Sequence, residues 1–348
     1  MDVHETAPAP LGIAVQEVDR WFGEHVTGAV PPLSYGRVTG GHSCLTYIAT
    51  DADGTRFVLR RPPVGALLAT AHDVTREARI MAALADTDVP LPRVLGVCDD
   101  PEVTGAHFYV MSHVDGLVVR DAANADQLLP SPAARRRAGY ALVDALAALH
   151  AIDIDAVGLG TLARREGYLD RQLRRWSAQW DACGLGDLGG ITRLHDWLVA
   201  NRPADSAPRI VHGDYRLGNA LLGPDGELHA ILDWELCTLG DPLADVAYLL
   251  RTWSATDART GGEQLPSALD GFASTDELAT RYAERSGQPV GQLDYWLAFT
   301  AWRAAGILAG VYRRYADGKM GDPPDDLPSF LVEVEARVQQ GRGFAGLS

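Results

Sequence analysis

Apolar residues recur at every second position in short runs over the first third of the chain, a pattern typical of β-strands. Turn residues separate these runs, and Asp51-Ala52-Asp53-Gly54 between the second and third runs is typical of a hairpin. We therefore expect an antiparallel five-stranded sheet, with strands at 33–38, 43–50, 55–61, 89–98 and 107–111.

Further along the chain the apolar spacing changes to three or four residues, which is the period of an amphipathic helix. Pro132 suits the first turn of a helix, and Ser274 with Glu277 has the sequence of a capping box. Two short apolar runs, 220–222 and 228–232, flank a Gly-Pro-Asp-Gly turn and predict one hairpin among these helices. The predicted class is α+β, with helices at 11–29, 71–85, 132–150, 168–182, 191–200, 240–253, 274–285, 292–315 and 327–340.

Three polar residues lie at the edges of the apolar runs around this hairpin: Asp214, Asn219 and Asp233. The two strands of the hairpin would hold Asn219 and Asp233 side by side, with Asp214 one loop away. Carboxylate and amide oxygens are hard ligands, which suit Mg²⁺ bound together with phosphate oxygens better than zinc. Each residue alone could equally cap a turn or end a strand, whereas the joint spacing favours a functional site.

Composition and charge restrict the class of protein. The 348 residues, 47% of them hydrophobic and 22% charged, are enough for two domains with substantial cores. The net charge of −15 argues against a nonspecific nucleic-acid surface or an anionic-membrane surface, and it weakly favours cationic substrates. Lys319 is the single lysine, so almost every basic residue is arginine.

The chain has four cysteines and no C-x-x-C pair, which is typical of buried thiols in a reducing compartment rather than of a zinc site. The first ten residues contain no apolar run, and the most apolar helix is too short to span a membrane. We therefore expect a soluble cytoplasmic protein. The cysteines are Cys44, Cys98, Cys183 and Cys237.

The spacing Asp214-x-x-x-x-Asn219, with Asp233 after a hairpin, resembles the catalytic loop and metal aspartate of the protein-kinase superfamily. Gly213 replaces the arginine of H-R-D, and Asp233-Trp234-Glu235 stands where D-F-G would be. These departures resemble the aminoglycoside phosphotransferase and choline kinase branch, whose motif is H-G-D-x-x-x-x-N followed by an I-D-W/F segment. The stretches 40–47, 89–97 and 234–250 are similar to the phosphotransferases found fused to, or beside, acyl-CoA dehydrogenases, although Cys44 stands where that group usually has asparagine.

The resemblance implies a bilobal protein-kinase-like fold. The expected parts are an N-terminal helical extension at 1–29, a nucleotide-binding lobe at 30–114 and a mainly helical lobe with the catalytic hairpin at 115–348, joined by a hinge at about 111–116. The resemblance also implies ATP or GTP as co-substrate, Mg²⁺ as cofactor and the hydroxyl of a small molecule as phosphate acceptor.

By the same resemblance, Asp214 would accept or orient the proton of the acceptor hydroxyl, and Asn219 and Asp233 would hold Mg²⁺. The third strand carries arginine where this superfamily normally has a phosphate-gripping lysine. We assign Arg60 to this position and expect Arg61 to point away, because neighbouring side chains on a strand face opposite sides. Arginine can bind two phosphate oxygens and keeps its charge, so the replacement is chemically competent.

On the helix at 71–85, Glu77 falls on the same side as Val74 and Met81, so it should face the core. A buried carboxylate needs a partner, and Arg60 is the natural one. The remaining implied contacts are with the nucleotide, from Gly40, Gly41, Ser43, Val58, Met111 and His113, and with the catalytic loop, from His212 and Asp245.

Two alternatives stay open. One is a nucleotide-binding pseudokinase that acts as an interaction module, since the usual lysine is missing. The other is a metal-dependent hydrolase with His212, Asp214 and Asp233 as ligands and His229 as a possible further one. Glu235 could be a second metal ligand, could meet a substrate cation or could equally be solvated. The acceptor could be an aminoglycoside, or a hydroxy acid or hydroxyacyl thioester.

Overall fold

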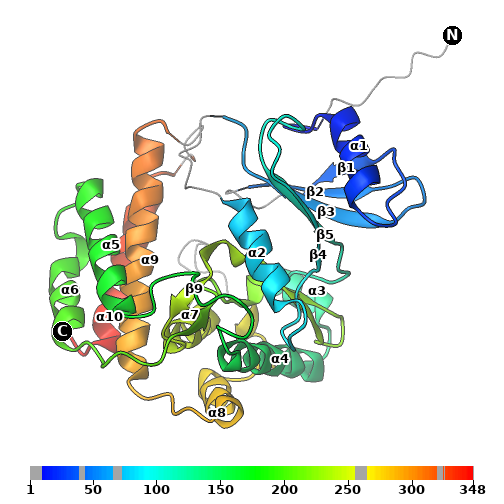
Figure 1. Ribbon diagram of the computed structural model, residues 1–348. Helices are drawn as coiled ribbons and strands as arrows, with labels where there is room; N and C mark the ends of the chain where they lie inside the picture. Colours follow the sequence, from blue (N-terminus) through cyan, green and yellow to red (C-terminus); the bar gives the residue numbers. More distant parts are fainter. Residues whose placement is uncertain are drawn as a thin grey trace. The chain divides into compact units, whose positions relative to one another are not determined.

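The computed structural model describes residues 10–38, 44–65, 73–254, 265–319, 324 and 326–347. The chain divides into two compact units (Figure 1). The first unit is Met1–Asp115 together with Ala230–Glu235, and the second is Gly116–His229 together with Leu236–Ser348. The predicted α+β class is confirmed, because the first unit contains a sheet and the second is mainly helical.

The sheet of the first unit has five antiparallel strands, as the alternating pattern predicts. Their order across the sheet is β1-β2-β3-β5-β4. The fourth strand begins later than expected, because Pro90 and Pro92 lack the backbone N–H that a ladder requires. The strands are β1 (Ser34–Arg37), β2 (Leu45–Thr50), β3 (Arg56–Arg61), β4 (Val94–Cys98) and β5 (Phe108–Ser112).

Two helices pack against this sheet. Helix α1 (Val15–His25) buries Trp21 and Phe22, and the Trp21 ring meets Phe108 of β5 edge-on at 4.8 Å. Helix α2 (Val74–Leu84) begins after Asp73, whose side chain accepts the Arg76 N–H, and it contacts β4 and β5. The side of the sheet that faces Trp21 holds an apolar cluster that includes Phe22, Phe57 and Phe108.

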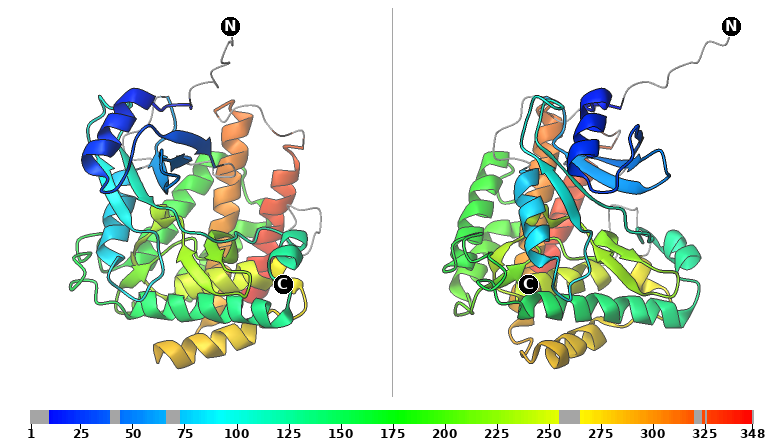
Figure 2. Two further views of the ribbon diagram at one scale, coloured as in Figure 1. Left: turned by 90° about the vertical axis from the view of Figure 1, so that its right-hand side faces the viewer. Right: turned by 45° about the vertical axis from the view of Figure 1, so that its right-hand side comes forward.

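The second unit contains eight helices of seven residues or more within the described ranges. Figure 2 shows α4 beside α8, and α9 beside α10, and these pairs are in contact. The elements are α3 (Ala122–Leu128), α4 (Pro132–Ala151), α5 (Tyr168–Cys183), α6 (Ile191–Ala200), β6 (Arg209–Val211), β7 (Ala220–Leu222), β8 (Leu228–Ile231), β9 (Thr238–Gly240), α7 (Leu243–Ser254), α8 (Thr275–Ser286), α9 (Leu293–Ala316) and α10 (Ser329–Phe344).

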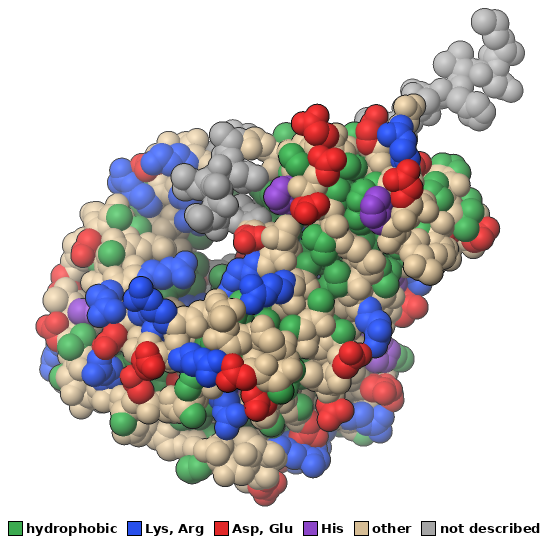
Figure 3. All heavy atoms as spheres, viewed as in Figure 1, with side chains coloured by type: hydrophobic (Ala, Val, Ile, Leu, Met, Phe, Trp, Pro, Cys, Tyr) green, Lys and Arg blue, Asp and Glu red, His purple; other side chains and the backbone are tan. Residues whose placement is uncertain are grey.

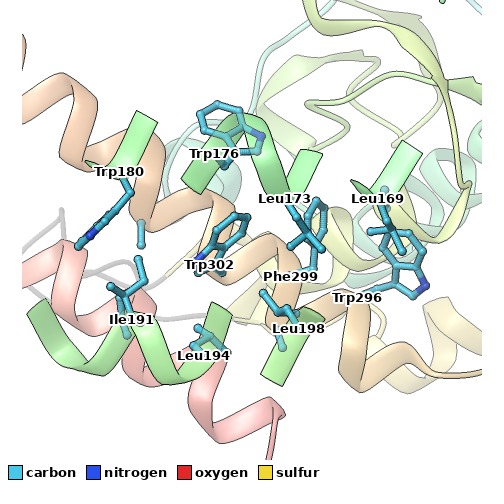
Figure 4. Packing of buried hydrophobic residues seen from close by; sticks show 14 of the residues in the cluster. Leu169, Leu173, Trp176, Trp180, Ile191, Leu194, Leu198, Trp296, Phe299 and Trp302 are labelled. Atoms are coloured by element: carbon cyan, nitrogen blue, oxygen red, sulfur yellow. The ribbon is translucent and has the colours of Figure 1, made fainter. Parts of the chain in front are cut away.

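The core of the second unit is rich in aromatic side chains. Trp296, Phe299 and Trp302 project from one long helix, α9, into a cluster with Leu169, Trp176 and Trp180 of α5; Trp296 lies at the Leu169 end of this cluster (Figure 4). Burying such large side chains supplies much of the hydrophobic stabilisation of a domain. Because this core lies between α5, α6, α9 and α10, it forms a rigid base for the loops of the unit.

The last helix is more buried than its largely polar sequence suggests. Helix α10 packs along α9 and buries Val334 and Val338, together with Glu333 and Arg337. Helix α9 carries apolar side chains around most of its circumference. Neighbouring elements must therefore pack against it on more than one side. The short elements α3 and β9 are also absent from the sequence-based expectation.

Charged side chains of both signs are interspersed over the face drawn in Figure 3, so acidic residues do not gather into one patch there. Among the helices of the described residues, none combines the length and the apolar character of a membrane-spanning segment. All four cysteines are free thiols, and only Cys44 is not fully buried.

Candidate functional site

The loop after β6 carries His212, Gly213 and Asp214, and its backbone is fixed by a buried carboxylate. Asp245, near the start of α7, accepts the His212 N–H at Oδ2 over 2.6 Å and the Gly213 N–H at Oδ1 over 2.8 Å. Its side chain is 1% exposed. Two charge-assisted hydrogen bonds in a dry environment therefore set the position of this loop.

Asp245 has its own support from two other helices of the second unit. His150 of α4 lies with Nε2 3.4 Å from Asp245 Oδ2, and its Nδ1 is 2.8 Å from the hydroxyl of Tyr282 on α8. Burial opposes ionisation of Asp245, but hydrogen bonds from His150 and from the backbone of Gly213, with the electrostatic effect of His150 and His212, outweigh it and keep the pKa of this carboxyl below its ordinary value.

Gly213 adopts a conformation that other residues would resist. Its φ is +86°, and a Cβ added there would lie 2.8 Å from the carbonyl oxygen of Leu236. Its own carbonyl accepts a hydrogen bond from Nη2 of Arg303 at 2.9 Å. The sequence analysis does not assign Arg303 to the site, although an arginine within the largely apolar stretch 295–311 is a signal that could have found it.

Asp214 and Asn219 are joined directly. The Asn219 amide nitrogen donates to Asp214 Oδ2 over 2.7 Å and to the Asp214 carbonyl over 2.9 Å. His212 is buried, and its Nδ1 is 3.2 Å from the Asp214 N–H, so this nitrogen is not free to bind a metal. Arg216 Nε lies 3.5 Å from Asp214 Oδ2. The loop thus presents one carboxylate in a defined orientation.

In the first unit, Arg60 of β3 lies at the centre of three carboxylates. Its Nε donates to Glu77 Oε2 over 2.9 Å, and its Nη2 lies 3.1 Å from Asp233 Oδ1 and 3.3 Å from Glu235 Oε2. The ion pair between Arg60 and Glu77 that the helix pattern predicts is therefore present. Arg61 faces the other side of the strand and donates to the carbonyls of Gly12 and Thr104, as the two-residue period requires.

Asp233 has a φ of +68°, one of two positive values among the described non-glycine residues. Such a conformation costs about 1–3 kcal/mol and persists where the surroundings impose it. The next residue, Trp234, is fully buried, and its indole N–H donates to the carbonyl of Ile231 over 3.0 Å. The packing of Trp234 anchors the segment and turns Asp233 toward Arg60.

The surplus of negative charge around Arg60 affects the acids beside it. Burial raises the pKa of Glu77 to about 6; Arg60 opposes this shift, and Asp233 and Glu235 reinforce it. Burial also raises the pKa of the Cys44 thiol to about 11, so this thiol is protonated near neutral pH. Three acids around one guanidinium leave a surplus of negative charge, which a further cation could balance.

The other residues assigned to the nucleotide fall into two groups. Val58 of β3 is the cross-strand partner of Met111 on β5, so the two side chains lie on one face of the sheet, the face of Arg60. His113 follows β5, and burial together with Arg56 lowers its pKa. Gly40, Gly41 and Ser43 lie outside the described residues.

The donor atoms at Asn219 and Asp233 are compatible with magnesium. The Asn219 amide nitrogen donates to Asp214, so its oxygen points away from that carboxylate. At Asp233, Oδ1 accepts from Arg60, and the side chain as a whole is 34% exposed. Amide and carboxylate oxygens are the hard ligands that Mg²⁺ prefers. Among the described side chains, no three of His, Cys, Asp or Glu form a preformed metal cluster.

Comparison with known proteins identifies the family. Residues 34–284 match the model of the APH group, described as the phosphotransferase enzyme family. The chain belongs to this family. It is therefore a small-molecule phosphotransferase with the kinase-like fold that its motif spacing predicts.

A solved structure from Ralstonia eutropha JMP134, assigned as an aminoglycoside phosphotransferase, is 33% identical to this phosphotransferase. It has a TM-score of 0.81, and the match covers 95% of this chain and 98% of that chain. A thermostable mutant of the aminoglycoside phosphotransferase APH(4)-Ia, in complex with AMP-PNP and hygromycin B, shares the fold at 18% identity. Its TM-score is 0.60, with coverage of 94% of this chain and 99% of that one.

A mouse protein, acyl-CoA dehydrogenase family member 10, is 34% identical over 342 residues, which is 97% of this chain and 31% of that protein. This phosphotransferase spans about a third of the length of the curated relatives it matches. The predicted similarity to the phosphotransferases associated with acyl-CoA dehydrogenases is confirmed.

Proposed function

We propose that this protein transfers the γ-phosphate of ATP or GTP to a hydroxyl of a small molecule, with Asp214 as the catalytic residue. The observation that carries the proposal is the 2.7 Å hydrogen bond from Asn219 to the Asp214 carboxylate, on a loop held by Asp245. Asp214 accepts or orients the proton of the acceptor hydroxyl, and the fixed loop keeps it aligned. Phosphoryl transfer depends mostly on positioning and charge neutralisation, so few groups suffice.

Asn219 and Asp233 supply the oxygen ligands of the metal in this proposal. When bound, Mg²⁺ would neutralise charge on the β- and γ-phosphates. Arg60 binds phosphate oxygens while Glu77 holds its Nε, and the surplus of acids around it accommodates the added cation. Glu235, bound to the same Nη2 as Asp233, is a candidate for a second oxygen ligand.

Binding of the nucleoside is assigned to the face of the sheet that carries Val58 and Met111, with the backbone near His113 next to the base. Gly40, Gly41 and Ser43 are proposed to cover the phosphates, because paired glycines let backbone N–H groups approach an anion. The AMP-PNP complex of APH(4)-Ia supports an adenine nucleotide, as a fold-level analogy.

Two classes of acceptor are proposed. The hygromycin B complex of APH(4)-Ia and the net charge of −15 support a cationic aminoglycoside-like acceptor. The relatives named as acyl-CoA dehydrogenases support a hydroxy acid or a hydroxyacyl thioester. A panel that contains both classes, read out by ADP formation with Mg·ATP and with Mg·GTP, separates them.

The variant Asp214→Ala tests the catalytic assignment. Transfer should be lost while the Kd for Mg·AMP-PNP stays within about twofold, because Asp214 acts on the acceptor and not on the nucleotide. Asp225→Asn is the matched control, since Asp225 lies in the exposed β7–β8 turn and pairs with Arg137. Transfer by Asp214→Ala at the wild-type rate would rule out this role.

The pseudokinase is the second candidate function, and the direct contact between Arg60 and Asp233 favours it. If the guanidinium kept its place on Asp233, it would exclude the metal. This alternative predicts nucleotide binding that does not depend on Mg²⁺, and no transfer to any acceptor of the panel. Tighter binding of AMP-PNP with Mg²⁺ than with EDTA would argue against it.

A further inference from the structure

The peptide unit between Gly213 and Asp214 is held at both of its polar ends. Its N–H belongs to Asp214 and lies 3.2 Å from Nδ1 of His212, within the loop itself. Its carbonyl oxygen belongs to Gly213 and accepts a hydrogen bond over 2.9 Å from Nη2 of Arg303, on α9. Because a peptide unit is planar, these two contacts fix the plane from which the Asp214 side chain departs.

The backbone at Gly213 needs such contacts because glycine leaves both of its dihedral angles permissive. Asp245 accepts the N–H groups of His212 and Gly213, so it holds the chain on the amino side of Gly213. The dihedral angle on the carboxyl side, ψ of Gly213, turns the carbonyl group and the Asp214 Cα together. Arg303 restrains this angle, because it holds the carbonyl oxygen.

The Arg303 guanidinium is itself fixed, by aromatic rings from two other helices. Its Cζ lies 5.6 Å from the centroid of the Trp176 ring on α5 and 6.0 Å from that of the Tyr248 ring on α7. Trp176 belongs to the aromatic core of the second unit (Figure 4). Arg303 is 7% exposed, and cation–π contacts are stronger in such desolvated surroundings than at the surface. The hydrogen bond to the loop therefore comes from a group with little freedom to move.

Stability alone is a poor explanation for an arginine at position 303. Taking a cation out of water is costly unless ion pairs and hydrogen bonds compensate it. The buried Nε of Arg303 has no hydrogen-bond partner among the described residues. An apolar side chain of similar length would fill the same space without this cost. The contact with the loop therefore explains the arginine better than packing does.

We propose that Arg303 is a positioning residue for phosphoryl transfer: its hydrogen bond to the Gly213 carbonyl sets the peptide before Asp214, and so the direction in which the carboxylate meets the acceptor hydroxyl. This inference rests on the proposed role of Asp214. It adds a residue from another helix, 90 positions after Gly213 and outside the H-G-D-x-x-x-x-N motif. Arg303 contacts the loop backbone and not the reacting atoms, so its loss slows transfer without abolishing it.

The contact is tested by NMR on the full chain, made by cell-free synthesis with 13C in the glycine carbonyl and 15N in aspartate. This pair of labels reports only Gly-Asp peptides, and the signal that disappears in Asp214→Asn belongs to the 213–214 peptide. We expect its carbonyl shift to change in Arg303→Met, which removes the donor. It should stay unchanged in Arg313→Met, because Arg313 is exposed on the same helix and pairs with Asp317. An unchanged shift in Arg303→Met would overturn the contact.

The role in transfer is tested by ADP formation from saturating Mg·ATP with water as the acceptor. We expect Arg303→Met to lower the rate about tenfold, the effect of one hydrogen bond from a charged group, and to leave the Kd for Mg·AMP-PNP within about twofold. Arg313→Met should keep the wild-type rate. A lower rate with an unchanged Kd separates positioning of the loop from damage to the nucleotide site.

A conservative variant separates positioning from packing. Arg303→Lys keeps a charge and a donor, whereas Arg303→Met keeps a similar length and neither of these. If the hydrogen bond to the loop matters, Arg303→Lys should recover part of the rate, although its buried ammonium makes it the less stable variant in urea denaturation. If packing alone matters, the more stable Arg303→Met should be at least as fast. That order of rates would overturn the positioning role.

The outcomes separate this inference from the function on which it rests. If Asp214→Ala loses ADP formation but Arg303→Met matches Arg313→Met, the positioning role is overturned and the proposed function stands. If Asp214→Ala keeps the wild-type rate, the proposed function fails, and the role of Arg303 in transfer fails with it. The NMR measurement needs neither nucleotide nor acceptor, so it decides the contact in either case.

Discussion

Arg60 donates from Nε to Glu77 Oε2 over 2.9 Å, and both side chains are largely buried in the first unit. This bond uses one edge of the guanidinium and leaves Nη2 to meet Asp233 and Glu235. A lysine has one nitrogen at the end of a flexible chain and could not serve both groups in the same geometry. An exchange of Arg60 for lysine is therefore not conservative.

Arg60→Lys should weaken nucleotide binding. The loss of a hydrogen bond to a charged group costs about 1.5–3 kcal/mol, which is about a ten- to hundredfold rise in the Kd for Mg·AMP-PNP. Calorimetric titration measures this change. Arg61→Lys is the matched control on the same strand, because Arg61 binds carbonyls on the opposite face and should affect stability alone. Equal Kd values for the two variants would contradict the assignment.

Gly213→Ala should destabilise the protein more than Gly54→Ala does. Both glycines have positive φ, at +86° and +83°, so both variants carry a similar backbone cost of about 1–3 kcal/mol. At Gly213 the new methyl group also meets the Leu236 carbonyl at 2.8 Å, whereas at Gly54 nothing lies within 4 Å. Urea denaturation gives the difference, and transfer activity should fall only in Gly213→Ala. Equal free energies of unfolding for the two variants would show that the loop moves enough to accommodate the methyl group.

Asp245→Asn should impair both stability and transfer. The amide has one acceptor oxygen for two buried backbone N–H groups, so at least one loses its partner, at a cost of about 1–3 kcal/mol. The loop would then shift, and a displacement of about 1 Å can lower turnover about a hundredfold. Thermal unfolding and kcat measure the two effects. The control is Asp144→Asn on α4, whose partly exposed ion pairs with Arg281 and Arg285 should contribute little.

Glu77 should make stability depend on pH below neutrality. Its pKa is about 6 in the folded chain against an ordinary value of 4.5, so the folded state binds this proton more tightly. The contribution to the free energy of unfolding is then largest below pH 4.5 and is lost as the pH rises through about 6, by up to about 2 kcal/mol. Subtracting the stability of Glu77→Gln from that of the wild type at each pH isolates this contribution. A difference that stays constant from pH 4.5 to 7 would refute the shift.

Local sequence patterns predicted most of the secondary structure. The five strands follow from two-residue alternation, and α6 spans the residues that its apolar spacing indicates. The start of β4 was misplaced because its prolines were counted within an apolar run. The strand β9 and the helix α3 are too short to show a period of their own, and β9 exists because it pairs with β6.

The sequence by itself determined the chemistry of this protein: the order of Asp214, Asn219 and Asp233, the family they indicate, and the pairing of Arg60 with Glu77. These follow from residue types and their spacing along the chain. The tertiary structure alone decided which distant side chain supports the loop, because Arg303 reaches it through helix packing that no local period encodes. It also decided that α10 is partly buried. This burial results from packing against α9, and the sequence of α10 alone does not indicate it.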